Sequence, residues 1–322
     1  MNYYLYKLKF SSPVHFGTSE SSRSIESADM TLRADTLFSA LSHAALKNNM
    51  LDELISLVKG DKLLFSDTMP YCGDELYIPK PALPAIKHID SDPSERKKMK
   101  KLKYIPISML GEFTASLKGE AKFDVNSAKK DFGDFNAVAK AAISGNERTQ
   151  PYSVGVFYFY ENCGIYGIVG YESEKSLELI KKLLDILGLE GIGGKASSGY
   201  GKFTVDDEIY IDTSVGGATE ILKNMLRSEN VEQYILLTTA LPNSDEFEKV
   251  TENAKYQLVR RSGFAFSASI SNPVKKQTQY YFAAGSVFDC RFSGALYDVG
   301  RNMPHPVYRY SKPIFLGVRL EK

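Results

Sequence analysis

The twelve residues Gly191–Lys202, GIGGKASSGYGK, carry the clearest structural signal in the chain. Their five glycines allow positive φ angles, so the backbone can approach a ligand closely. The other polar residues of the stretch include Lys195, Ser197, Ser198 and Tyr200. Amides, hydroxyls and a lysine can donate to phosphate oxygens, and a tyrosine ring can stack on a nucleobase. The stretch therefore predicts a loop that holds a phosphate-bearing ligand; the alternative is a connector that glycine merely permits.

Two enzyme motifs compete for the same stretch, and neither fits. A P-loop requires a glycine five residues before Gly194 and a Ser or Thr after Lys195, but those positions hold Leu189 and Ala196. The Rossmann fingerprint is formally matched, but it must follow a strand and open a helix. Here the pattern predicts a helix before the loop and a strand after it. A nucleotide-binding enzyme is therefore disfavoured.

The segments around the loop predict an α+β fold. Apolar periodicity indicates a strand at 2–10 and a helix at 35–48, with Asp35 placed to cap it. A second helix is expected at 174–187, between Ser173 and Gly188 as caps. Further strands are expected at 62–65, 76–79, 152–160, 164–171 and 201–211, the third and fourth with hairpin spacing. This order is typical of a ferredoxin-like or RRM-like domain.

Length and composition indicate two globular domains. The chain has 322 residues, 43% hydrophobic and 25% charged, which are ordinary globular values. We expect an RRM-like domain over 1–212, with a polar, basic insertion at about 84–150 and the glycine-rich loop at 191–201. A β-rich, RRM-like domain follows over 213–322. No apolar run approaches the ~20 residues of a membrane span. Three scattered cysteines predict neither a disulfide framework nor a metal pair, which favours a reducing, cytoplasmic setting.

Charge is strongly segregated along the chain. Residues 255–322 contain eleven Lys or Arg against three Asp or Glu, whereas residues 204–252 contain eleven acidic residues against three basic ones. A further run of lysines lies near residue 100. Basic clusters of this kind are either solvated faces or polyanion-binding faces, and composition does not choose between them.

Several sequence motifs, which follow one another along the chain, resemble motifs of the RAMP superfamily of CRISPR-associated proteins. The glycine-rich loop lies between a helix and the last strand of the first domain, as in that family. PVHFG (13–17) resembles its first loop, and DTLFSAL (35–41) resembles its first helix. RRSGF (260–264), AGSVF (284–288) and HPVYRY (305–310) resemble the fourth subunits of type III-A Csm effector complexes.

The resemblance implies a non-catalytic subunit that binds the 5′ tag of a CRISPR RNA, without cofactor or metal. It implies two RRM-like domains, with a β-hairpin thumb inserted in the first. Contacts are implied with a large polymerase- and cyclase-like subunit and with a backbone RAMP subunit. A target RNA duplex would lie near the thumb, which could wedge apolar residues between bases. The insertion offers Ile105, Ile107, Met109, Leu110 and Phe113 for that role.

The expected RNA-binding residues lie mainly on the loop and on nearby basic positions. They are His15, Arg33, Arg148, Gly193, Gly194, Lys195, Ser197, Ser198, Tyr200, Arg260 and Arg261. Neighbours on a strand point to opposite faces, so at most one of Arg260 and Arg261 is expected to meet RNA directly.

His15 also supports an alternative function. RAMP processing ribonucleases use a histidine in this neighbourhood as an acid or base, and the pKa of an imidazole suits that role. The alternative is therefore a metal-independent endoribonuclease that processes CRISPR RNA. The non-cleaving reading is preferred because the narrower phrases match a non-cleaving subunit.

Overall fold

The core of the structure is a sheet of seven strands in which β1 (Asn2–Phe10) lies second from one edge. The computed structural model describes residues 1–17, 25–84, 93–142, 150–265, 267 and 270–319. In order across the sheet, the strands are β11 (Phe203–Tyr210), β1, β10 (Cys163–Tyr171), β5 (Met69–Cys72), β6 (Glu75–Pro79) and β7 (Tyr104–Pro106), and β4 (Leu63–Phe65) pairs with β10. All the pairings are antiparallel. An α+β fold is thereby confirmed.

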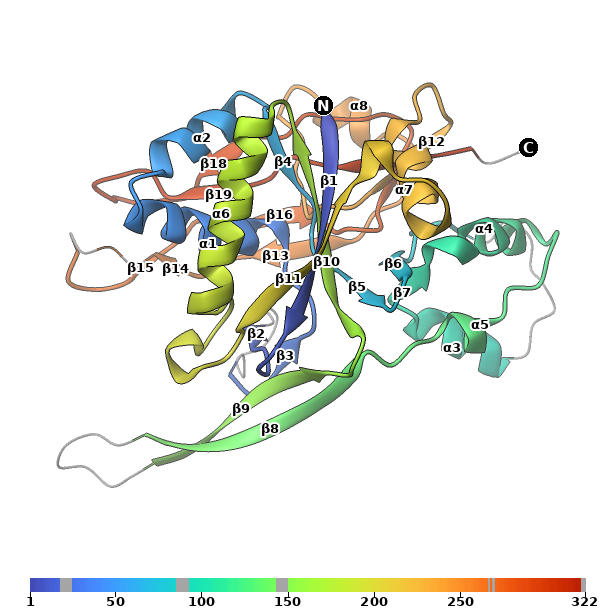
Figure 1. Cartoon of the computed structure of the whole chain (residues 1–322). Coiled ribbons are helices and arrows are strands. Elements are labelled where there is room, and N and C mark those ends of the chain that lie inside the picture. The colour runs from blue at the N-terminus through green and yellow to red at the C-terminus, as the bar shows by residue number, and fades with distance from the viewer. Residues whose placement is uncertain (18–24, 85–92, 143–149, 266, 268–269, 320–322) are drawn as a thin grey trace.

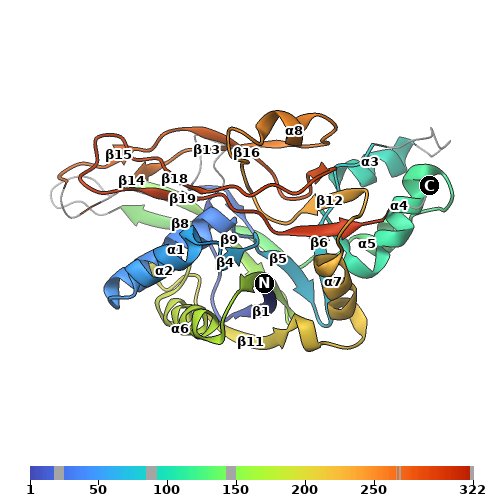
Figure 2. The same ribbon diagram turned by 90° about the horizontal axis from the view of Figure 1, so that it is seen from above.

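Both faces of this sheet are buried, and β1 shows why. Tyr4, Tyr6 and Leu8 enter one hydrophobic cluster, whereas the alternate residue Leu5 enters another. The first face is covered by α1 (Ala34–Lys47), α2 (Leu51–Lys59) and α6 (Glu174–Glu190) (Figure 1). The second face is covered by α7 (Gly217–Arg227) and by strands of the C-terminal half (Figure 2). The two halves of the chain therefore share a core.

The C-terminal half is built from one small sheet and several ribbons. Its three-stranded sheet has the order β17 (Val287–Phe288), β12 (Gln233–Leu236), β20 (Phe315–Val318). The two-stranded ribbons are β13 (Leu258–Arg261) with β16 (Gln279–Phe282), β14 (Phe264–Ala265) with β15 (Val274–Lys275), and β18 (Leu296–Asp298) with β19 (Tyr308–Tyr310). A short helix, α8 (Phe247–Thr251), lies near the edge of this layer (Figure 2).

The insertion contains helices as well as a long hairpin. After β6 come α3 (Pro93–Lys101), β7, α4 (Leu110–Lys118) and α5 (Val125–Ala128). β8 (Gly133–Ala142) then pairs with β9 (Gln150–Phe159) over ten residue pairs, and this hairpin projects from the body of the molecule (Figure 1). The predicted hairpin between 152–160 and 164–171 is therefore wrong, because β9 pairs with β8 while β10 pairs with β1 and β5.

The apolar residues proposed as a wedge are not on the hairpin. Ile105, Ile107, Leu110 and Phe113 are 0–5% exposed and pack in the second hydrophobic cluster. Met109 is half-buried beside them. The prediction fails because the segment 104–118 pairs with β6 and then forms α4, so its apolar side chains turn into the core.

The ends of α1 and α6 agree only in part with the predicted capping residues. Ser173 caps α6 through a reciprocal capping box with Ser176, as predicted. The helix ends later than expected: Gly188 is helical and Gly191 is the C-cap residue. Asp35 does not cap α1, because Arg33 occupies the cap position and Asp35 is the second residue of the first turn.

Cys72 and Cys163 lie opposite each other on β5 and β10, with Cα atoms 4.2 Å apart, and form a disulfide. The expectation that the cysteines stay unpaired is therefore wrong, because strand pairing joins positions 91 residues apart. In the described part of the chain, no helix combines the length and the apolar character needed to cross a bilayer.

Candidate nucleic-acid interface

The glycine-rich loop connects α6 to β11 and is fastened at several points. Ile192 donates to the carbonyl of Gly201 at 2.9 Å, which closes the loop on itself, and its side chain is 1% exposed. Gly201 donates to the carbonyl of Pro13 at 2.9 Å. Positive φ angles at Gly191, Gly193, Lys195, Gly199 and Gly201 make the reversal possible. The loop is thus a shaped element, in contrast to a connector that glycine merely permits.

Two glycines of the loop pack directly against the segment after β1. A Cβ atom on Gly193 would lie 2.8 Å from the ring of Phe16, and one on Gly194 would lie 2.5 Å from Cδ2 of His15. The amide of Gly194 also donates to the carbonyl of His15 at 2.8 Å. These positions require glycine because a side chain would collide with residues 15–16.

His15 connects the loop to the hairpin. Its side chain is 7% exposed, and Nδ1 lies 2.6 Å from the carbonyl oxygen of Gly155 on β9. A carbonyl only accepts, so Nδ1 carries the proton in this bond. The imidazole is therefore held between the loop and β9, with Nε2 on the side of Gly194.

The far end of the loop contacts the hairpin through two lysine–tyrosine pairs. Nζ of Lys195 lies 5.1 Å from the ring centre of Tyr152 and 3.4 Å from its hydroxyl. Nζ of Lys140 lies 5.1 Å from the ring centre of Tyr200. Lys140 and Tyr152 are themselves opposite each other on β8 and β9. Each pair is a cation–π contact, and together they hold the loop against the hairpin.

A cleft of about 280 Å³ gathers five of the predicted residues. His15, Arg33, Gly193, Gly194 and Arg261 all line it. The exposed backbone of the two glycines forms one wall, and α1 forms the other. We call this the loop cleft. Ser197 and Ser198 are exposed further along the loop, next to half-buried Lys195 and Tyr200.

Sequence reasoning missed part of the same cleft. Thr36, Ser39, Ala40 and His43 of α1 also line it. Their spacing along the helix places them on one face, and this polar stripe was the available signal. Lys140 and Tyr152 gave no such signal, because their neighbourhood depends on the pairing of β8 with β9.

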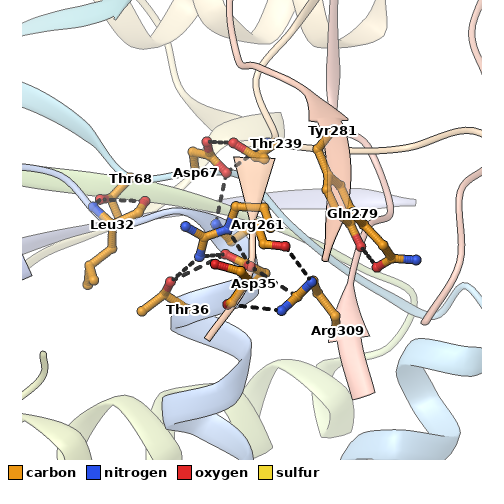
Figure 3. Close-up of polar contacts among 12 residues, drawn as sticks. Leu32, Asp35, Thr36, Asp67, Thr68, Thr239, Arg261, Gln279, Tyr281 and Arg309 are labelled. Carbon is orange, nitrogen blue, oxygen red and sulfur yellow. Dashed lines mark hydrogen bonds and ion pairs between the residues drawn. The ribbon is translucent and has the colours of Figure 1, made fainter. Parts of the chain in front are cut away.

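Arg261 is held inside the protein by an ion pair (Figure 3). Its guanidinium donates to both oxygens of Asp35, and the side chains are 13% and 7% exposed, respectively. Arg309 flanks the same carboxylate at 3.8 Å and donates to the carbonyls of Arg261 and Gln277. Asp35, predicted as a helix cap, therefore serves as the acceptor that joins α1 to β13 and β19.

The two adjacent arginines of β13 differ as strand alternation requires. Arg261 is half-buried, whereas Arg260 is exposed on the other face of the strand. Arg260 is thus the better placed of the two to reach a phosphate. Arg148 lies outside the described residues.

Asp67 supplies the acceptor that α1 needs at its first turn. Its carboxylate accepts from the amide of Ala34 at 2.8 Å and from the amide and hydroxyl of Thr239 at 2.9 and 2.6 Å. Burial raises the pKa of Asp67 above its ordinary value, although these hydrogen bonds oppose the change. The residue links α1 to the C-terminal half (Figure 3).

Among the described residues, no group of three or more His, Cys, Asp or Glu side chains is placed to hold an ion.

Two family models divide the chain between them. The model of the RAMP superfamily matches residues 7–204, and the model of the CRISPR Csm4 C-terminal domain matches residues 229–318. Together with the shaped glycine-rich loop, these matches define the class: a RAMP protein of CRISPR systems.

Curated relatives narrow the class. The chain is 34% identical to a CRISPR system Cms protein Csm4 of Mycobacterium tuberculosis (strain CDC 1551 / Oshkosh), over 99% of this chain and 98% of that protein. It is 30% identical to the Csm4 protein of Streptococcus thermophilus, over 99% and 100% of the two chains. The chain belongs to the Csm4 family.

Solved structures agree on the fold. A Csm3–Csm4 subcomplex of a type III-A interference complex contains a chain with a TM-score of 0.67 and 19% identity, covering 99% of this chain and 100% of that one. A Csm1–Csm4 cassette in complex with cA4 contains one with a TM-score of 0.63 and 20% identity, and both chains are covered completely.

Proposed function

We propose that this protein is a non-catalytic subunit of a type III-A CRISPR interference complex and that it binds the 5′ tag of the CRISPR RNA. The loop cleft is the observation that carries the proposal. It presents the backbone of Gly193 and Gly194 beside Arg33, on a loop that is fastened to β9 and to residues 13–16. Unpaired RNA is held by such backbone and cation contacts to phosphate, together with stacking of splayed bases.

Two protein partners follow from family membership. Csm4 chains occur with Csm3 and with Csm1 in the similar structures. We therefore expect this chain to contact a backbone RAMP subunit and a large polymerase- and cyclase-like subunit. The basic C-terminal third and the acidic segment 204–252 offer surfaces of opposite charge for these contacts.

We also propose that the first domain is ferredoxin-like and carries a thumb. The order β11-β1-β10-β5, with α1 and α6 on one face, supports a ferredoxin-like first domain. The hairpin β8–β9 is the candidate for the thumb, and a target RNA duplex would lie beside it. The protein would act in the cytoplasm.

His15 bears on the non-catalytic assignment. It packs against Gly194 and is tied to a backbone carbonyl, which supports a role in shaping the loop. As a general acid or base, His15 would instead need to exchange a proton with the RNA, which requires its imidazole to lie within hydrogen-bond reach of the substrate. Incubating the purified chain with precursor RNA in chelator tests this directly. No specific cleavage is expected, and cuts that disappear in His15→Ala would establish the ribonuclease alternative.

The binding proposal is tested by purifying the affinity-tagged chain from its host and sequencing the RNA that accompanies it. Small CRISPR RNAs with a common 5′ end are expected, together with the two partner subunits. Purification without such RNA would contradict the proposal.

A further inference from the structure

A second concave site lies at the root of the hairpin, away from the glycine-rich loop. Its volume is about 510 Å³, and it is bounded by α3, α5, β7 and the beginning of β8. Its charged rim consists of five lysines and one aspartate: Lys98, Lys101, Lys103, Lys129, Lys130 and Asp131. We call it the lysine-rimmed groove. Its size suits a nucleobase or a larger ligand, and its charge suits an anion.

The floor of the groove is aromatic, and one ring is open to solvent. Phe135 is 59% exposed, whereas its cross-strand partner Phe157 is 2% exposed and lies with its ring centre 4.6 Å away. Tyr77 and Phe132 pack edge to face deeper in the groove, with ring centres 4.8 Å apart. Phe135 therefore offers a firmly backed face for stacking.

A third hollow adjoins both the groove and the loop cleft and shares lining residues with each. This central cleft, of about 460 Å³, shares Asp29, Thr31 and Arg33 with the loop cleft. It shares Leu102, Lys103 and Tyr104 with the lysine-rimmed groove. A single strand can therefore follow one path from the glycine-rich loop to Phe135.

The charges along the central cleft favour a strand with a phosphate backbone. Its cationic residues are Arg33, Lys80, Lys100 and Lys103. Its two carboxylates are those of Asp29 and Asp67, and Asp67 is 7% exposed with its oxygens taken by Ala34 and Thr239. The path therefore presents cations to an incoming phosphate backbone.

We infer that the lysine-rimmed groove is a nucleotide subsite for the guide RNA, in which one base stacks on Phe135 while the rim lysines hold the neighbouring phosphates. The inference rests on the proposed function, because the strand in the groove is the continuation of the strand held at the loop. An acidic protein segment would match the charge of the rim. Continuity with the loop cleft and the backed, exposed aromatic ring favour RNA.

Crosslinking tests the position of the strand. The probe is a 4-thiouridine-substituted copy of the RNA that co-purifies with the tagged chain, added to the full-length protein. Trypsin releases the peptide 131–140, which carries Phe135. A crosslink on this peptide is expected, in addition to one on the loop.

Affinity measurements with a matched pair test the stacking. Phe135→Ala is expected to weaken binding of the labelled RNA about 10-fold, as loss of one base–aromatic stack does. The control is Tyr158→Ala, which removes a 42% exposed ring that is on the same hairpin but does not line the groove. Thermal unfolding of both variants verifies that they are folded.

The rim is tested through salt dependence. Lys101→Gln with Lys130→Gln should reduce the slope of log affinity against log salt by about 1.4, since each phosphate contact on a single strand contributes about 0.7. The control replaces Lys97 and Lys122, which are exposed nearby but do not line the groove.

Equal affinities of the Phe135 and Tyr158 variants, without a crosslink on peptide 131–140, would overturn the inference. The inference would also be overturned if the Phe135 and rim variants bound RNA normally but recovered less of the partner subunits. That result would mean that the groove binds an acidic protein segment. Wild-type RNA affinity in a loop variant, Lys195→Asn with Tyr200→Ala, would instead contradict the proposed function. The two failures are therefore distinguishable.

Discussion

The guanidinium of Arg261 donates hydrogen bonds to both carboxylate oxygens of Asp35, at 2.8 and 2.7 Å, across a separation of 226 residues. The pair joins the first turn of α1 to β13 and is flanked by the buried Arg309. It also explains the different settings of two adjacent arginines. Arg261 satisfies an internal carboxylate, whereas Arg260 stays on the outer face of the strand.

Removing Asp35 should therefore destabilise the whole fold. Asp35→Ala leaves Arg261 without its carboxylate and Arg309 without its neighbouring charge, so we expect a loss of about 3 kcal/mol in the free energy of unfolding. Urea denaturation measures it. Glu190→Ala serves as the control because it breaks an ion pair with Lys47 whose side chains are 40% and 61% exposed. That change should cost at most about 1 kcal/mol, and equal losses in the two variants would contradict the structural role of Asp35.

RNA affinity should depend on the loop. Lys195→Asn with Tyr200→Ala removes one cation and one stacking face, and we expect RNA binding to weaken at least about 10-fold. Asparagine is chosen because Lys195 has φ of +63°, a conformation that asparagine tolerates. The measurement is fluorescence anisotropy with the co-purifying RNA.

Two control variants accompany the loop variant. Tyr200→Phe keeps the ring that Lys140 contacts and should retain affinity. Lys182→Ala removes an exposed lysine of α6 outside the loop and should have little effect. A weakened Tyr200→Phe variant would mean that the hydroxyl, and not the ring, matters.

Gly194→Ala should displace His15. The added Cβ would lie 2.5 Å from Cδ2 of the imidazole, so we expect a loss of about 1–3 kcal/mol in unfolding free energy together with weaker RNA binding. Gly111→Ala is the control, since a Cβ there meets nothing within 4 Å and the residue does not line the loop cleft. In His15→Ala the same Gly194 substitution should cost markedly less, and strict additivity of the two changes would argue against the collision.

Asp67 should make stability depend on pH. Burial raises the pKa of Asp67 in the folded state above its ordinary value of 3.8. The folded protein therefore holds this proton more tightly, and the corresponding stability is lost as pH rises from about 4 through the folded pKa. Asp67→Asn removes the buried charge, and its amide can still accept from Ala34 and donate to the Thr239 hydroxyl.

The stability of Asp67→Asn relative to the wild type should therefore increase with pH across that window, as measured by urea unfolding at pH 4, 6 and 8. Asp67→Ala should lose about 1–3 kcal/mol or more at pH 6, because three donors lose their acceptor. A relative stability of Asp67→Asn that falls with pH would show that hydrogen bonding outweighs burial.

Local sequence patterns are sufficient to predict individual helices and strands. The apolar period of 35–48 and of 174–187 predicted α1 and α6 within a few residues, and alternation predicted β1 and β11. The glycine-rich loop and the phrases around it indicated the family that the comparisons then confirmed. These predictions succeed because helix period, strand alternation and glycine content are properties of a short stretch of chain.

The sequence does not predict which distant segments pair with each other. Proximity along the chain predicts that β9 pairs with β10, but its partner is β8. The scattered spacing of the cysteines predicts that Cys72 and Cys163 stay unpaired, but they form a disulfide. Ile105 and Phe113 are expected as wedge residues, but both are buried. Each error has the same origin: spacing along the chain does not specify which segment an apolar or reactive side chain will meet.

The sequence by itself thus determined the helices and strands of the α+β fold and the glycine-rich loop with its amides, hydroxyls and lysine. Only the tertiary structure decided which of those groups converge. It brought His15, Arg33 and Gly194 to one cleft, turned Arg261 toward Asp35, and placed Phe135 among lysines from α3 and the segment after α5. The physical reason is that hydrogen bonds, ion pairs and stacking act over a few ångströms, and folding alone sets those distances.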